Sequence, residues 1–102
     1  MDEPYLLVLH PFATMVETTE HKRKQLIFRS WHRGTREMDM IMGRFADQFV
    51  PEFSDNGLEI YEDLLQVPDP DIYDWICGRA DVPANYDNNI VKKLIEHKTH
   101  VR

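Results

Sequence analysis

Apolar residues recur every three or four positions along most of the chain, which is the spacing of amphipathic α-helices. One set lies between Arg36 and Pro51 and consists of Met38, Ile41, Met42, Phe45 and Phe49. A second set follows Ser54, a good helix N-cap, and consists of Leu58, Tyr61, Leu64 and Leu65. A third, near the C-terminus, consists of Ile90, Val91, Leu94 and Ile95. These sets predict three helices, each with one face in a common core.

Start and stop signals add a helix in front of these three. It is predicted from about Thr19 to His32, and Gly34 supplies the left-handed residue that ends it. Arg33 then lies at the negative end of the helix dipole, an interaction worth about 0.3–1 kcal/mol. Gly34 can also cap the next helix, which places Glu37 where its carboxylate reaches back to the cap.

A fifth, short helix is predicted from Pro70 to Cys77. Asp69 caps it, Pro70 takes the first helical position, and Gly78 ends it. Asp87 is the expected cap of the last helix. With short connections and no strand signal, the sequence predicts an all-α fold, a single compact five-helix bundle.

Composition and charge narrow the class of protein. The chain has 102 residues, 42% of them apolar, which suits one domain. Its net charge of −6 argues against nucleic-acid binding, although residues 21–36 hold six Lys or Arg and no acid. The single cysteine fits a reducing compartment. The apolar stretch at 4–16 is shorter than the roughly 20 residues of a membrane span, so residues 1–18 are interpreted as an N-terminal arm and 19–102 as the domain.

The motifs of common catalytic sites are missing from the sequence. The glycines are too far apart for a phosphate-binding or dinucleotide-binding loop; they are Gly34, Gly43, Gly57 and Gly78. His97 and His100 have a spacing that suits a metal, but no third ligand lies near them, and a solvated pair is the better interpretation. Cys77, beside Trp75 and Ile76, is expected in the core. Nothing in the sequence points to an enzyme.

The Arg-Gly-Thr-Arg-Glu motif at residues 33–37 has two interpretations. If the motif is only a joint between helices, it explains Gly34 by the need for a positive φ and Glu37 by the favourable place of a carboxylate in the first turn of a helix. It does not account for Arg36, which places a positive charge at the positive end of a helix. A structural joint and a binding surface therefore both stay open at this point.

The segments RKQLIFRSWHRGTREMDMIMGRFAD and DPDIYDWICG resemble the succinate dehydrogenase assembly factor family, in its bacterial form. The family hallmark is Arg-Gly-x-x-Glu, matched by Arg33, Gly34 and Glu37. The resemblance covers about residues 20–98. It implies a five-helix protein that is not itself an enzyme and binds no FAD stably. Such a protein binds the flavoprotein subunit of succinate dehydrogenase or fumarate reductase and promotes covalent attachment of FAD to that subunit.

The resemblance also implies a set of partner-binding residues. Arg33 and Glu37 are expected to make charge-assisted contacts with the flavoprotein, and Gly34 to permit close backbone approach. The other candidates are Arg36 and Asp39, flanking that contact, and Trp31 and Tyr73, as aromatic anchors.

Two other classes of function stay open. A small helical nucleic-acid binder would use the basic helix at 19–32, and a regulatory or antitoxin-like protein-interaction module would have a different partner. Under the preferred interpretation we expect a cytoplasmic bacterial monomer with no membrane insertion and no nucleic-acid partner.

Overall fold

A computed structural model describes residues 11–100 of the chain, with side chains for residues 18–97. Five α-helices make up most of this part: α2 (Pro11–Ser30), α3 (Arg36–Phe49), α4 (Asp55–Leu64), α5 (Asp69–Cys77) and α6 (Asn89–His100). Two 3₁₀ turns, Val50–Glu52 and Ala84–Tyr86, complete it. The described residues contain no strand, so the predicted all-α five-helix fold is confirmed.

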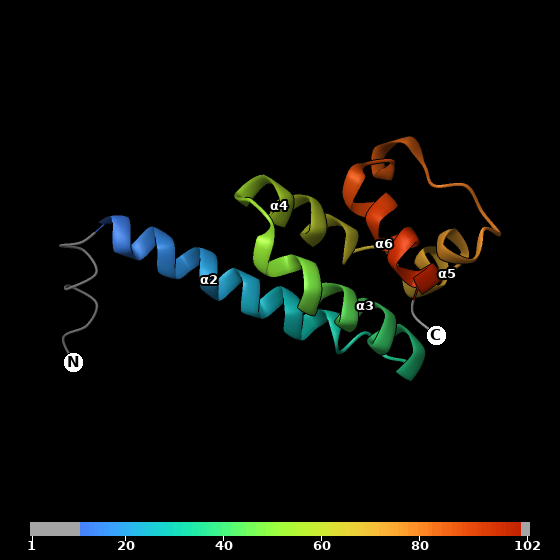
Figure 1. Cartoon of the computed structure of the whole chain (residues 1–102), viewed down its shortest axis with the longest axis horizontal. Helices are drawn as coiled ribbons and strands as arrows, with labels where there is room; N and C mark the ends of the chain where they lie inside the picture. Colours follow the sequence, from blue (N-terminus) through green and yellow to red (C-terminus); the bar gives the residue numbers. More distant parts are fainter. Residues whose placement is uncertain (1–10, 101–102) are drawn as a thin grey trace.

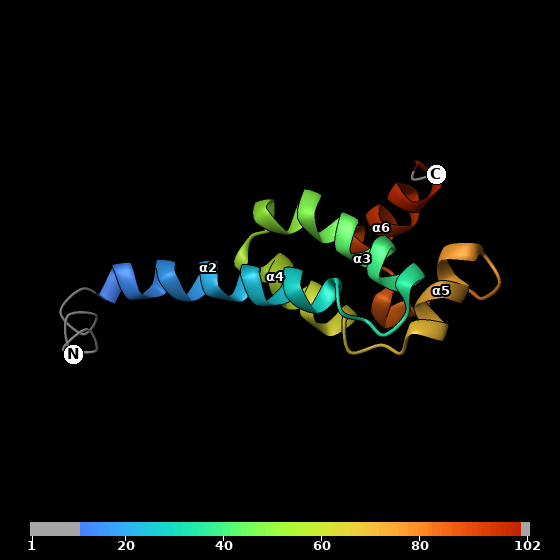
Figure 2. The ribbon, with the colours of Figure 1, turned by 90° about the horizontal axis from the view of Figure 1, so that it is seen from below.

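Two of the helices, α3 and α4, pack against the second half of α2 (Figure 1). α3 turns back along α2, and α4 packs against α2 from another side. α5 and α6 gather at the end of the molecule where α2 finishes, and α6 also contacts α3 and α4. The first turns of α2 extend past the other helices, which a view from below shows as well (Figure 2). In the described residues, no helix has the length and apolar character needed to cross a membrane.

The core forms from the faces that the apolar spacing predicts. Its buried members include Met38, Ile41, Met42 and Phe45 of α3, Leu58, Tyr61 and Leu64 of α4, and Val91 and Leu94 of α6. Phe49, Ile90 and Ile95 are partly buried against them. Trp75 is 8% exposed, as expected for a core residue. Cys77 is exposed, so its predicted place in the core is wrong.

One polar contact lies inside this core, between α2 and α4. Ser30 Oγ donates to the carbonyl of Leu26, 2.8 Å away, and lies 2.6 Å from the Tyr61 hydroxyl. Because the serine proton is engaged, the tyrosine hydroxyl is the donor in the second bond. Burial raises the pKa of Tyr61 to about 12. The pair fixes the register of α4 on α2.

The first helix differs at both ends from the prediction. It begins at Pro11 rather than Thr19, because no breaker lies between these residues and proline suits a first helical turn. It ends at Ser30 rather than His32. The amide N–H groups of Trp31 and His32 bond to carbonyls three residues back, which tightens the last turn.

Three predicted caps are also wrong. Thr35, not Gly34, caps α3, and its Oγ1 accepts from Met38 N at 3.2 Å. Asn88, not Asp87, caps α6 through a 2.9 Å bond from Val91 N. Asp69 is the first residue of α5 and makes no cap, because its carboxylate binds Arg33. The Ser54 cap and the left-handed Gly78, by contrast, are confirmed.

Candidate partner-binding site

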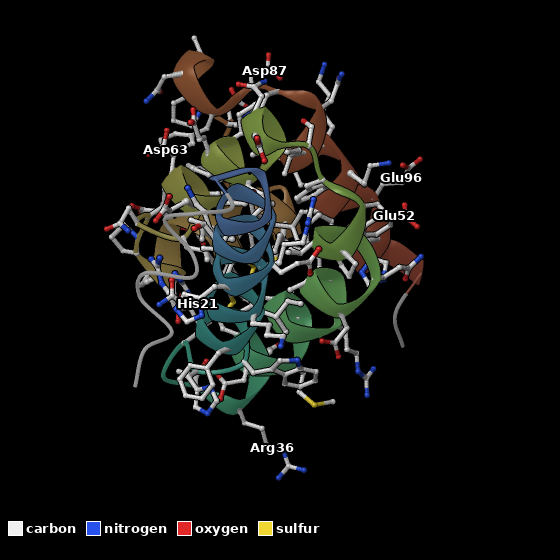
Figure 3. The ribbon with its side chains drawn as sticks, turned by 90° about the vertical axis from the view of Figure 1, so that its left-hand side faces the viewer. His21, Arg36, Glu52, Asp63, Asp87 and Glu96 are labelled. Carbon is white, nitrogen blue, oxygen red and sulfur yellow. The ribbon has the colours of Figure 1, made fainter. Side chains whose placement is uncertain are left out.

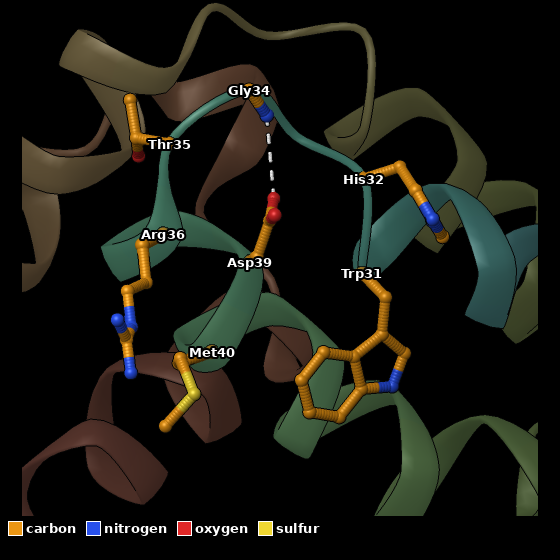
Figure 4. Close-up of a pocket in the computed structure, with 7 residues that line it drawn as sticks. All are labelled: Trp31, His32, Gly34, Thr35, Arg36, Asp39 and Met40. Carbon is orange, nitrogen blue, oxygen red and sulfur yellow. Dashed lines mark hydrogen bonds between the residues drawn. The ribbon is translucent and has the colours of Figure 1, made fainter.

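The α2–α3 loop, residues 31–35, carries most of the motif (Figure 4). Gly34 has a φ of +129°, and a Cβ built there would meet nothing within 4 Å. The Asp39 carboxylate accepts hydrogen bonds from the backbone N–H groups of Arg33 and Gly34. A side chain of α3 thus holds the loop backbone, and the loop's outer side is left open at the glycine.

The Arg33 side chain points into the protein and binds the segment between α4 and α5. Its guanidinium donates to the Asp69 carboxylate, to the Leu65 carbonyl and to the Val67 carbonyl, each at 2.8 Å. The side chain is only 10% exposed. Because α2 ends at Ser30, the expectations that Arg33 lies in its last turn and that Gly34 ends it are wrong. Its donors are engaged internally, so Arg33 positions the loop and the start of α5.

A hollow of about 480 Å³ lies on the outer side of this loop. It is lined by Trp31, His32, Gly34, Thr35, Arg36, Asp39 and Met40 (Figure 4). Four of these were candidates from the sequence; His32, Thr35 and Met40 were not. The Arg36 side chain extends away from the body of the protein and makes no ion pair with the described residues (Figure 3). The hollow is therefore an open surface with apolar walls and one available cation.

Glu37 and Tyr73 form a separate pair that does not line the hollow. The Tyr73 hydroxyl donates to Glu37 Oε2 at 3.1 Å, which joins α5 to the start of α3. Hydrogen bonds with Cys77 and with Glu37 raise the pKa of Tyr73, so the phenol stays protonated and able to donate. The Arg79 guanidinium lies 5.3 Å from the centre of the tyrosine ring. The Glu37 carboxylate is thus oriented by α5 while it stays exposed.

Trp31 forms one wall of the hollow and is held against α3. A Cβ added at Gly43 would lie 2.1 Å from the indole Cδ2, so the ring covers the helix backbone at this glycine. The indole Nε1 donates to Asp47 Oδ1 at 3.2 Å. The ring is half-buried. Gly43 is therefore required for the position of Trp31.

Phe28 is an exposed residue that was not among the candidates predicted from the sequence. Its side chain is 62% exposed, and among the residues the structure describes it is the large apolar side chain that stands out from the surface. Its ring stacks on that of His32 at 3.9 Å. Helical phase would have found it, because Leu26 and Ser30 define the buried side of α2 and Phe28 lies about 200° around the helix from Leu26.

The described residues hold no group of three or more His, Cys, Asp or Glu side chains that could bind a metal. His97 is half-buried rather than fully solvated: its ring contacts Phe45 and Phe49 edge-on, and its Nε2 lies 3.2 Å from Gln48 Oε1. The side chain of His100 lies outside the described residues.

The fold and this loop define a small all-α protein with an open hollow at one helix joint. Residues 24–98 match the family described as "Flavinator of succinate dehydrogenase", and the chain belongs to that family. This agrees with the resemblance noted in the sequence.

Individual relatives agree with the family match. The chain is 37% identical over 82 residues to succinate dehydrogenase assembly factor 2, mitochondrial, of Dictyostelium discoideum, covering 80% of this chain and 57% of that protein. For the protein of the same name from Scheffersomyces stipitis the identity is 33%, over 94% and 66% of the two chains. FAD assembly factor SdhE of Acetobacter pasteurianus is 32% identical, over 74% and 69%. No solved structure matches.

Proposed function

We propose that this protein binds the flavoprotein subunit of succinate dehydrogenase, or of fumarate reductase, and promotes covalent attachment of FAD to it. Family membership supports the proposal, as do the names of the relatives. The observation that carries it within this chain is the hollow at the α2–α3 loop, where Gly34 of the family motif and Arg36, at one of its variable positions, are open to a partner.

The residues of the motif then divide into two roles. Gly34 and Arg36 contact the flavoprotein, because a Cβ-free backbone allows close approach and a guanidinium with no ion-pair partner among the described residues is available to bind a carboxylate. Glu37, oriented by Tyr73, presents an anion beside them. Arg33 and Asp39 act from inside by holding the loop that carries the contact.

The chemistry explains why a partner without a catalytic group helps. Attachment through the flavin 8α-methyl requires loss of a proton, and the resulting electron-rich ring must be stabilised by a preorganised site in the flavoprotein. A protein that binds one conformation of the flavoprotein shifts its population toward that conformation. We propose that this chain acts in this way as a monomer, is not itself an enzyme, and holds no FAD of its own.

The charge pattern supports a protein partner over a nucleic acid. Several cations of α2 are engaged with acids: Arg23 bonds Glu20, and Lys22 binds Glu62 at 2.9 Å. Arg29 lies 3.8 Å from the same Glu62. The basic run in the sequence is therefore partly neutralised on the folded surface, which is unlike the phosphate-binding face of a nucleic-acid binder.

The test is in-gel flavin fluorescence of the flavoprotein subunit after reaction with FAD and this protein. Arg36→Ala is expected to slow flavinylation at least tenfold, because it removes the open cation of the hollow. Arg44→Ala is the matched control: it removes an exposed arginine from the same helix, outside the hollow, and is expected to act as the wild type. Flavinylation that is independent of the protein, or a tight stoichiometric complex of FAD with the isolated chain, would refute the proposal.

A further inference from the structure

The outer face of α2 forms a surface continuous with the hollow. Gln25, Phe28 and His32 follow one another at three- and four-residue spacing and are all exposed, on the side opposite Leu26 and Ser30. His32 belongs to both surfaces, because it lines the hollow and stacks on Phe28. The Phe28 ring therefore lies directly beside the hollow.

The Phe28 ring is held in place before any partner arrives. The rings of Phe28 and His32 are 3.9 Å apart with an interplanar angle of 22°. His32 Nδ1 lies 2.7 Å from the Phe28 carbonyl, and since a carbonyl only accepts, the imidazole N–H donates there. The imidazole is thereby anchored at one edge and supports the phenyl ring. An exposed aromatic side chain fixed in this way loses little conformational entropy when it is buried by a partner.

We propose that Phe28, supported by His32, is an aromatic anchor that inserts into an apolar recess of the same flavoprotein, next to the contact made by the motif. The inference rests on the proposed function and extends its interface along α2. Aromatic residues are enriched in the buried centres of protein interfaces, and the continuity through His32 places Phe28 within one such patch.

The charges around the ring indicate the chemistry of the recess. Lys24, one turn before Phe28, is exposed and makes no ion pair with the residues whose side chains are described. Arg36 provides a second open cation on the other side of the hollow. A recess with an apolar floor and acidic groups at its edge complements this arrangement.

Binding of purified flavoprotein to Phe28→Ala tests the inference. The dissociation constant is expected to rise at least tenfold, and Phe28→Trp is expected to restore wild-type binding. Ile60→Ala is the matched control, because Ile60 is a partly exposed apolar residue of α4 that does not belong to the core. It is expected to bind within twofold of the wild type, and thermal melts of all variants are expected to agree with that of the wild type.

A photo-crosslinking benzoylphenylalanine at position 28 identifies the occupant directly. Crosslinks to the flavoprotein, absent when the same group is placed at position 60, support the inference. Crosslinks to a second copy of this chain, or a Phe28→Ala dissociation constant within threefold of the wild type, overturn it. If the wild type binds and Phe28→Ala binds equally well, only this inference fails. If the wild type does not bind the flavoprotein at all, the proposed function fails too.

Discussion

Replacing Arg33 with alanine should destabilise the protein far more than the loss of a helix-end charge would. The variant leaves the Asp69 carboxylate and the carbonyls of Leu65 and Val67 without their donor. A buried polar group without a partner costs about 1–3 kcal/mol, and breaking a buried ion pair costs about 3–5 kcal/mol. Because the Asp69 side chain is 18% exposed, water recovers part of that cost, and we expect about 2–4 kcal/mol.

The assay is thermal unfolding followed by circular dichroism. For a domain of this size 1 kcal/mol shifts the midpoint by roughly 4–8 °C, so Arg33→Ala should melt roughly 8–32 °C below the wild type. Arg36→Ala, three residues away, is the matched control. It should change stability by less than about 0.5 kcal/mol, because its guanidinium has no partner among the described residues.

Two further variants test the geometry of the contact. Arg33→Lys should recover less than half of the lost stability, because one ammonium does not reproduce the planar fork that reaches three acceptors. In a double-mutant cycle with Asp69→Ala, the coupling energy should exceed about 1 kcal/mol. A melt of Arg33→Ala within about 3 °C of the wild type would refute the internal role of this arginine.

Two other variants probe contacts inside the bundle. Gly43→Ala should displace Trp31, red-shift tryptophan emission and lower the free energy of unfolding by about 1–3 kcal/mol through steric strain. In a Trp31→Ala background the same change should be neutral or stabilising. An unchanged emission spectrum in the single variant would contradict the contact. Tyr61→Phe should remove a pH dependence of the free energy of unfolding. The raised pKa of Tyr61 contributes stability that is present below the ordinary tyrosine pKa of 10.0, and roughly 2–3 kcal/mol of it is lost as the pH rises toward about 12. Denaturant unfolding at pH 9–12 measures it, and equal slopes for the two proteins would contradict it.

The fold follows from the sequence where local signals agree. The face of α3 is predicted because its apolar residues keep one helical period and Pro51 ends it. Cys77 shows where neighbouring residues mislead: Ile72 and Ile76 lie one turn apart and define the buried side of α5, while Cys77 is rotated about 100° from Ile76 and faces out.

The site is predicted only in part, because its arrangement depends on long-range contacts. The motif identifies Gly34, and Arg36 stands at one of its variable positions; the place of both residues follows from the joint between two helices. The inward direction of Arg33 does not follow from any local pattern, because two of its acceptors are backbone carbonyls 32 and 34 residues further along the chain. Every residue has a backbone carbonyl, so the sequence does not indicate which carbonyls accept hydrogen bonds from Arg33.

The Arg33 contact with residues 65–69 makes the proposed binding surface a property of the whole domain rather than of its first two helices. During synthesis, α2 and α3 leave the ribosome before the segment that accepts the arginine, so the Arg33 side chain has no acceptors at residues 65–69 until α4 and the start of α5 have folded. A chain that stops or misfolds before that point carries the complete motif but lacks the contacts that hold the Arg33 side chain. The proposed contact with a flavoprotein therefore requires that α4 and the start of α5 have folded.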